Sequence, residues 1–240
     1  TCHFVDDEVM PGTLMYECCL HTLRIFLLRM GWIAEEADTT WQPVPGIKSR
    51  LRCRGQVLAT TSMVTYEIHV QELGYRPEPY AIVDALMYSD GKPIVDIRDM
   101  SVRLTGTDRQ QLEAMWAERG ESADSAVAVT GAPPPDKVTA TPPPDRVTTA
   151  PPSAAPTGAQ VAYDKESILA FSTGQPSEGF GEPYRIFDEG GRRIARLPRP
   201  PFQFLDRIIA VEGEPFVMRE GAKITAEFDV KPDHWYFESN

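Results

Sequence analysis

The sequence predicts an α+β protein in which one apolar helix packs against a sheet of antiparallel strands. Residues 13–30 carry apolar side chains around nearly the whole helical circumference, and a helix of this kind is enclosed by other elements. Residues 47–104 contain several stretches in which apolar and polar side chains alternate, which is typical of strands. The chain of 240 residues is long enough for one large or two small domains.

The helix follows a Met10-Pro11-Gly12 corner and is expected to reach about Met30. Glu17 lies one turn inside it. A buried carboxylate is costly unless it is hydrogen-bonded or protonated. Two interpretations stay open: Glu17 pairs with His21 at i+4 or Arg24 at i+7, or it has a functional role.

After a loop over residues 39–46, four strands are expected to form an antiparallel meander. The turn Ser89-Asp90-Gly91-Lys92 predicts a hairpin between the second and third long strands. The expected strands are 47–54, 63–73, 80–88 and 94–104, and a short charged helix or tail follows at 107–119.

The strand predicted at 47–54 alternates strictly, as a strand with one buried face does. Its even positions are all cationic, namely Lys48, Arg50, Arg52 and Arg54. Either neighbouring acids balance a solvated face, or this face docks an anionic partner.

A stretch rich in Ala, Pro, Thr and Ser divides the chain. It contains an internal repeat, Pro-Pro-Pro-Asp-Lys-Val-Thr-Ala from 133 and Pro-Pro-Pro-Asp-Arg-Val-Thr-Thr from 142, and lacks the apolar content needed to offset ordering entropy. We therefore predict a linker at 119–162 between segments 1–118 and 163–240. In the second segment, 170–185 is expected to be irregular, and strands are expected within 202–211 and at 222–230.

Composition narrows the class of protein. The net charge of −11 argues against nucleic acid as a partner. The apolar run 23–33 is too short to span a bilayer and contains two arginines. The four cysteines form no CxxC pair, and Cys2 with His3 lacks metal-ligand spacing. We expect a cytoplasmic protein with reduced cysteines, no metal and no membrane span.

His3, Met10-Pro11-Gly12 and Glu17, in this order, resemble the signature of the FabA-type 3-hydroxyacyl-thioester dehydratases, which have the hotdog fold. The amino-acid sequence from Cys2 to Met15 is most similar to the dehydratase regions of polyunsaturated-fatty-acid and polyketide synthases. The resemblance implies a long central helix wrapped by a curved antiparallel sheet, as part of a double hotdog. Residues 198–240 resemble the opening strands of the same fold, with Asn240 at the position of the histidine.

The resemblance also implies a lyase activity, the dehydration of 3-hydroxyacyl thioesters to 2-enoyl thioesters. Neutral His3 would remove the C2 proton. Glu17, its pKa raised by burial, would protonate the leaving hydroxyl. Gly12 would let the thioester carbonyl approach the backbone N–H groups at the start of the helix.

The expected partners are an acyl carrier protein and a neighbouring hotdog unit or homodimer partner. The resemblance implies that His3 works with a carboxylate of that unit and Glu17 with a histidine of that unit. No cofactor is expected beyond the phosphopantetheine that carries the substrate. The carrier is acidic, so Lys48, Arg50, Arg52 and Arg54 are its expected dock. A second cluster comprises Arg192, Arg193, Arg196 and Arg199.

Two other functions remain open. One is a non-catalytic hotdog unit that scaffolds or binds acyl chains in a megasynthase, as Asn240 suggests. The other is a hotdog thioesterase, which uses a carboxylate and a water in place of a histidine base.

The chain looks like a piece of a longer synthase that holds the later part of one hotdog unit and the opening part of the next. The first part lacks opening strands and the second lacks a central helix. We therefore predict that 202–230 pairs into the sheet formed by 47–104 and covers the helix at 13–30, as in a circular permutant.

Overall fold

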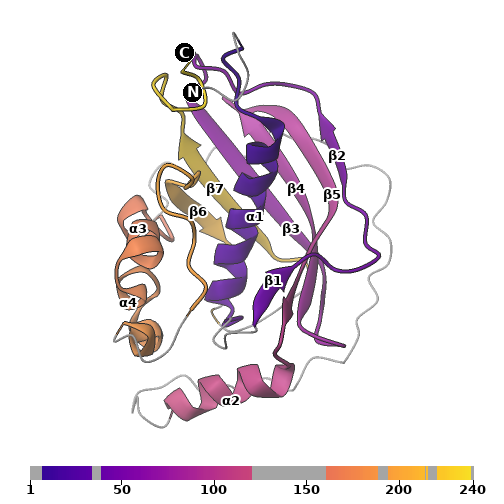
Figure 1. The fold of residues 1–240 in the computed structure, drawn as a ribbon, viewed down its shortest axis with the longest axis vertical. Coiled ribbons are helices and arrows are strands. Elements are labelled where there is room, and N and C mark those ends of the chain that lie inside the picture. Colours follow the sequence, from indigo (N-terminus) through magenta and orange to yellow (C-terminus); the bar gives the residue numbers. More distant parts are fainter. Residues whose placement is uncertain are drawn as a thin grey trace.

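The fold is built around α1 (Gly12–Arg29), which lies across the concave side of a curved sheet (Figure 1). A computed structural model describes residues 7–33, 39–120, 161–188, 194–213, 215 and 221–238. The helix begins and ends close to the predicted positions. Its inner side is fully buried at Cys18, Leu23 and Phe26.

The described strands form one antiparallel sheet in the order β1-β5-β4-β3-β7-β6, with β2 also paired to β5. The strands are β1 (Thr40–Gln42), β2 (Arg50–Cys53), β3 (Met63–Gly74), β4 (Tyr80–Ser89), β5 (Lys92–Thr105), β6 (Arg207–Val211) and β7 (Lys223–Asp229). The predicted hairpin is confirmed: β4 and β5 pair through Ser89↔Lys92, and Asp90 and Gly91 have the positive φ angles that such a turn requires. β1 falls within the segment predicted to be a loop.

The sheet joins segments that are far apart in the chain. β7 pairs antiparallel with β3, from Met63↔Asp229 to His69↔Lys223, and β6 continues the sheet beyond β7. The prediction that 202–230 pairs into the sheet of 47–104 is therefore confirmed. α1 packs against β3, β4 and β7, so the second segment also helps to cover the helix.

Alternation along the strands places the core between the sheet and α1. In β3 the side chains of Val64, Tyr66 and Ile68 are fully buried, as expected for the inner positions of a strand with period two. Ile224 and Ala226 of β7 lie opposite Ile68 and Tyr66 and are equally buried. The two segments thus share a single hydrophobic core.

A layer of short helices packs beside α1 and was not predicted. It contains α3 (Lys165–Thr173), α4 (Pro176–Phe180) and the 3₁₀ helix η1 (Glu182–Phe187). The prediction that 170–185 is irregular is wrong. Gly174 and Gly181 mark the ends of α3 and α4, and Gly179 lies where two helices are in close contact. A Cβ on Gly179 would lie 2.5 Å from the Ser167 carbonyl oxygen.

Two contacts tie this layer and the strand β6 to the end of α1. The Tyr184 hydroxyl donates to the Leu28 carbonyl oxygen, and Arg29 Nη1 donates to the Gly213 carbonyl oxygen at 2.9 Å. The charged helix predicted at 107–119 is present as α2 (Arg109–Gly120). Trp116 Nε1 donates to the Gly31 carbonyl oxygen at 2.7 Å, just beyond α1.

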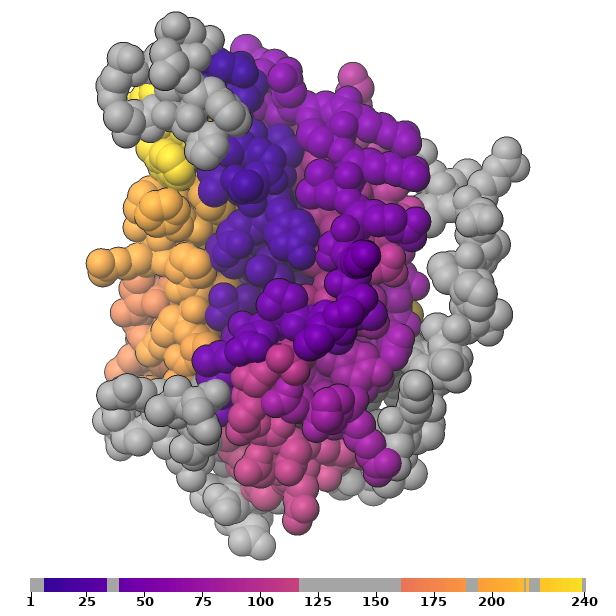
Figure 2. Space-filling view, turned by 45° about the vertical axis from the view of Figure 1, so that its right-hand side comes forward, coloured from indigo at the N-terminus to yellow at the C-terminus, as the bar shows by residue number. Residues whose placement is uncertain are grey.

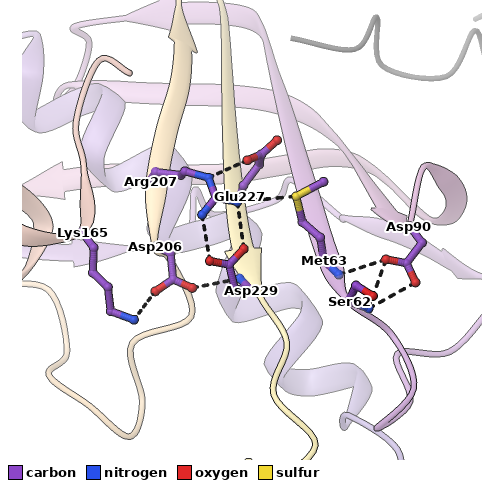
Figure 3. A network of polar contacts seen from close by, with 8 residues as sticks. All are labelled: Ser62, Met63, Asp90, Lys165, Asp206, Arg207, Glu227 and Asp229. Carbon is purple, nitrogen blue, oxygen red and sulfur yellow. Dashed lines mark hydrogen bonds and ion pairs between the residues drawn. The ribbon is translucent and has the colours of Figure 1, made fainter. Parts of the chain in front are cut away.

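A polar network fastens β6 and β7 to each other and to β3 (Figure 3). Arg207 binds Glu227 at 2.6 Å and Asp229 at 2.8 Å, and its Nη2 also lies 3.6 Å from Met63 Sδ. Asp206 accepts a hydrogen bond from the Asp229 N–H at 2.8 Å and forms an ion pair with Lys165 at 2.5 Å. These contacts connect α3, β6, β7 and β3. A curved antiparallel sheet wrapped round one long helix is the α+β hotdog fold that was predicted.

Candidate active site

The Met10-Pro11-Gly12 corner is anchored to the segment that follows β2. The Met10 N–H donates to the Val57 carbonyl oxygen at 2.9 Å, and Val9 forms an isolated antiparallel bridge with Leu58. Met10 is buried, so its side chain fixes the corner to the core. Pro11 is the N-cap of α1 and supplies no side-chain cap.

The start of α1 presents backbone donors to solvent. The amides of Leu14 and Met15 donate to the Pro11 carbonyl oxygen at 3.0 and 3.2 Å. The amides of Gly12 and Thr13 precede these bonds and have no recorded acceptor within the described part of the chain. Gly12 is exposed, and the place where its Cβ would lie has no heavy atom within 4 Å. An anionic oxygen therefore has room to approach two N–H groups and the positive end of the helix dipole.

Glu17 is in an environment different from the one predicted. Its side chain is 42% exposed, and its Oε1 lies 2.8 Å from Nε2 of the buried His21, within ion-pair range. Interaction with His21 lowers the pKa of Glu17, more than desolvation raises it. The expectation of a buried carboxyl with a raised pKa is therefore wrong for this chain. The pairing at i+4, which the sequence left open, is the one observed.

Part of α1 remains open to solvent beside Glu17. Figure 2 shows the indigo helix at the surface, between the orange second segment and the purple strands that follow α1. The half-exposed side chains along this stripe are Tyr16, Glu17, Leu20 and Arg24. Tyr16, Leu20 and Arg24 follow one another at intervals of four residues, and Glu17 lies three residues before Leu20, so the four side chains share a face.

Two of the predicted site positions cannot be placed against Glu17. His3 and Asn240 lie outside the described residues. The structure therefore brings together Gly12 and Glu17 on the first turns of α1. The role of His3 stays a prediction.

A buried polar group under α1 was not anticipated from the sequence. Burial raises the pKa of the Cys18 thiol and of the Tyr66 hydroxyl well above their usual values, so both stay neutral. Burial also raises the pKa of Tyr236, whose hydroxyl lies 2.8 Å from Nδ1 of His234. Alternation in 63–73 predicts that Tyr66 points inward, but no local pattern shows that the distant Tyr236 lies near it.

The cationic strand lies at an edge of the sheet and has no buried face. Every residue from Pro45 to Arg54 is exposed, and Ile47 and Leu51 are 38% and 46% exposed. The prediction of one buried face is wrong because α1 packs on β3, β4 and β7, so the inner side of β2 is left uncovered. Lys48, Arg50, Arg52 and Arg54 are all exposed. Of the second cluster, Arg192 and Arg193 lie outside the described residues, and Arg196 donates to the carbonyl oxygens of Phe171 and Gly174.

The described ranges show neither a metal cluster nor a membrane helix. They contain no group of three or more His, Cys, Asp or Glu residues that could hold a metal ion. They also contain no helix that is both long and apolar enough to cross a membrane. Cys18, Cys19 and Cys53 are free thiols.

Comparison with known proteins gives a consistent result for the first segment. Residues 1–98 match the family model of the FabA-like domain. The chain is 34% identical over 85 residues, 35% of its length, to one of the proteins that make up the polyunsaturated fatty acid synthase of Thraustochytrium sp., and it spans 6% of that protein. The corner, the exposed helix start and the sheet wrapped round α1 agree with this match, so residues 1–98 are similar to a FabA-like domain with the hotdog fold.

Proposed function

We propose that this chain takes part in the dehydration of 3-hydroxyacyl thioesters, carried by an acyl carrier protein, to 2-enoyl thioesters. The observation that carries the proposal is the order His3, Met10-Pro11-Gly12, Glu17 inside a FabA-like domain. The relative's name places that protein in fatty acid synthesis, which agrees with a thioester substrate.

In the proposed reaction the thioester carbonyl accepts hydrogen bonds from the Gly12 and Thr13 amides. Negative charge develops on this oxygen when the C2 proton leaves, so donors fixed at a helix N-terminus stabilise the transition state more than the substrate. The missing Cβ of Gly12 leaves room for this approach. Thr13 and Glu17 are four residues apart and therefore lie on one face of α1.

His3 acts as the base that removes the C2 proton, and a protonated Glu17 gives its proton to the hydroxyl that leaves C3. The Glu17 carboxyl is ionised beside His21 in this chain. We propose that a facing hotdog unit covers the exposed stripe of α1, and that the loss of solvent raises the pKa of Glu17. The unit that covers α1 would also supply the second member of each acid–base pair.

The exchange Glu17→Gln tests the acid role in the intact protein that carries this chain. The rate of hydration of a 2-enoyl thioester should fall by about 10²–10⁴-fold, the usual contribution of general acid–base catalysis, and His3→Ala should have a similar effect. Glu113→Gln is the matched control: Glu113 is 64% exposed on α2 and pairs with Arg109 at i+4, so its exchange should leave the rate within twofold. Unchanged rates in both Glu17→Gln and His3→Ala would refute the proposal.

The ionised and half-exposed Glu17 also favours a second candidate, a hotdog unit that binds acyl chains without turnover or hydrolyses thioesters through a carboxylate and a water. For a non-catalytic unit, acyl-thioester binding would be measurable while Glu17→Gln changed no rate. For a thioesterase, free thiol would appear, and its release would depend on Glu17 but not on His3.

A further inference from the structure

Arg50 and Arg52 of β2, Lys48 before the strand and Arg54 directly after it are named here the cationic edge. All four are exposed, and β2 pairs with β5 alone among the described strands. Arg50 makes a long ion pair with Asp99, at 3.4 Å between two exposed side chains. For the side chains of the other three, the described part of the chain records no counter-ion.

The acidic residues nearest to the cationic edge are already engaged. Asp96 lies opposite Arg52 in the β2–β5 register, yet it is bound at 2.7 Å by Arg98, which also binds Asp84 at 2.7 Å. Arg98 itself lies opposite Arg50. β5 therefore presents a cation and a neutralised acid to β2. The sequence had left open that neighbouring acids balance the charge of this face. For Arg52 they do not, because the acid opposite it, Asp96, is paired with Arg98.

Strand geometry keeps these charges close to one another. Alternate residues of a strand are about 6.6 Å apart, less than the Debye length of about 8 Å at physiological ionic strength, so Arg50 and Arg52 of β2 repel each other. An anionic surface placed against them removes this repulsion. The whole chain carries a net charge of −11, so most of its surface repels an acidic partner. The cationic edge is a local positive strip, and an acidic partner would bind in the orientation that faces it.

The cationic edge also leads to the candidate site. Arg54 is followed three residues later by Val57, whose carbonyl oxygen accepts the Met10 N–H at 2.9 Å. Met10 is two residues before Gly12, at the start of α1. Figure 1 shows the end of β2 and the start of α1 at the same end of the molecule.

We propose that the cationic edge is the docking surface for an acidic acyl carrier protein, whose prosthetic arm then reaches the Gly12 end of α1. Anionic side chains and the phosphate at the base of the arm bind the exposed guanidinium groups of Arg52 and Arg54. Docking here places the arm beside the corner that holds the helix start. The choice of a carrier as the partner rests on the proposed function.

The test compares two double charge reversals in the intact protein. Arg52→Glu with Arg54→Glu reverses the unpaired end of the cationic edge. Arg185→Glu with Lys231→Glu is the matched control, because it makes the same change in net charge at exposed cations of the second segment that belong to neither cationic cluster. For each protein, KM is measured for a carrier-bound 2-enoyl thioester and for a small 2-enoyl thioester. Binding of the carrier without an acyl group is measured by fluorescence anisotropy.

We expect the first double variant to raise KM for the carrier-bound substrate at least tenfold at low salt, and to leave kcat/KM for the small thioester within twofold. The carrier should bind at least tenfold more weakly, with a smaller difference at high salt, and the control variant should match the unmodified protein. Equal effects on both substrates, an equal loss in the control variant, or equally strong displacement of the carrier by polyglutamate would overturn the proposal. If the unmodified protein turns over neither substrate, the proposed function fails, and the anisotropy measurement still decides whether the cationic edge docks the carrier.

Discussion

At the scale of single residues, the contact between Glu17 and His21 lowers the pKa of the candidate acid. Because the interaction with His21 is the largest influence that lowers the pKa of Glu17, His21→Asn should raise this pKa toward the usual value of a glutamate. Carbon NMR of the labelled carboxyl group measures it directly. Arg24→Gln should raise it less, because Arg24 acts on Glu17 only through its charge. A Glu17 pKa that is the same with and without His21 would contradict this assignment.

A second carboxylate, Glu67 on β3, stabilises the fold in a pH-dependent manner. Its side chain is 6% exposed, and it contacts Lys223 Nζ at 2.7 Å and His69 Nε2 at 3.5 Å, while the Tyr88 hydroxyl donates to it at 3.3 Å. Burial alone would raise the pKa of Glu67, but the interactions with His69 and Lys223 lower it from 4.5 to about 2. Since the folded-state pKa is below the unfolded value, the stabilisation is complete above about pH 5 and is lost as the pH falls through 4.5 toward about 2.

Lys223→Met removes the cation and leaves Glu67 buried without it. We expect a loss of about 1–3 kcal/mol in the free energy of unfolding at pH 7. The difference from the unmodified protein should shrink as the pH falls toward 2, because the Glu67 carboxyl of the unmodified protein then begins to be protonated as well. Urea unfolding at several pH values measures this. A difference that stays constant from pH 7 to pH 2 would show that Lys223 acts through packing instead.

At the scale of elements, Arg207 connects the two strands supplied by the second segment. Arg207→Ala leaves Glu227, whose side chain is 13% exposed, without its cation, so we expect a loss of about 1–3 kcal/mol in the free energy of unfolding. Arg185→Ala is the control: Arg185 and Glu182 are 66% and 68% exposed, and such a pair contributes at most about 1 kcal/mol. Equal losses of unfolding free energy in the two variants, measured by urea unfolding, would mean that the Arg207 network does not stabilise the pairing of β6 with β7.

Most elements could be predicted from the sequence because their signals are local. Alternation identified β3 and β4, and the Asp-Gly pair identified the hairpin that leads into β5. The helices α3 and α4 were missed because glycines that end a helix, such as Gly174, resemble glycines of a loop. Their starts were visible: Asp164 accepts the Ser167 N–H at 2.8 Å as an N-cap, and Pro176 is at the start of α4.

The candidate site was less predictable than the elements. The order of Met10-Pro11-Gly12 and Glu17 indicated where it lies, and the spacing to His21 indicated a possible pair. The sequence cannot show which side of an apolar helix is open to solvent, because this depends on where α3, α4 and β7 pack against α1. The same limit explains Leu51: its alternation with cations is that of a half-buried strand, but α1 does not reach the sheet edge on which it lies.

At the scale of the whole molecule, the pairing of β3 with β7 implies that the two segments hold together without a covalent connection. A protease site placed between the two Pro-Pro-Pro-Asp repeats allows the chain to be cut there after folding. Because the segments share one sheet and one core, the two pieces should co-elute in size-exclusion chromatography and retain the circular dichroism spectrum of the uncut protein. Separation of the pieces under native conditions would contradict this pairing. An uncut chain passed through the same protease treatment without the inserted site is the control.

The central claim is that this FabA-like domain supports the addition and removal of water at C3 of an acyl thioester. The most direct measurement is mass spectrometry of a 2-enoyl thioester incubated with the intact protein in water enriched in heavy oxygen. The account predicts an intact 3-hydroxyacyl thioester with heavy oxygen on C3, formed by the unmodified protein and by Glu113→Gln but not by Glu17→Gln. Heavy oxygen in a free carboxylic acid, or an unchanged 2-enoyl thioester, would contradict it.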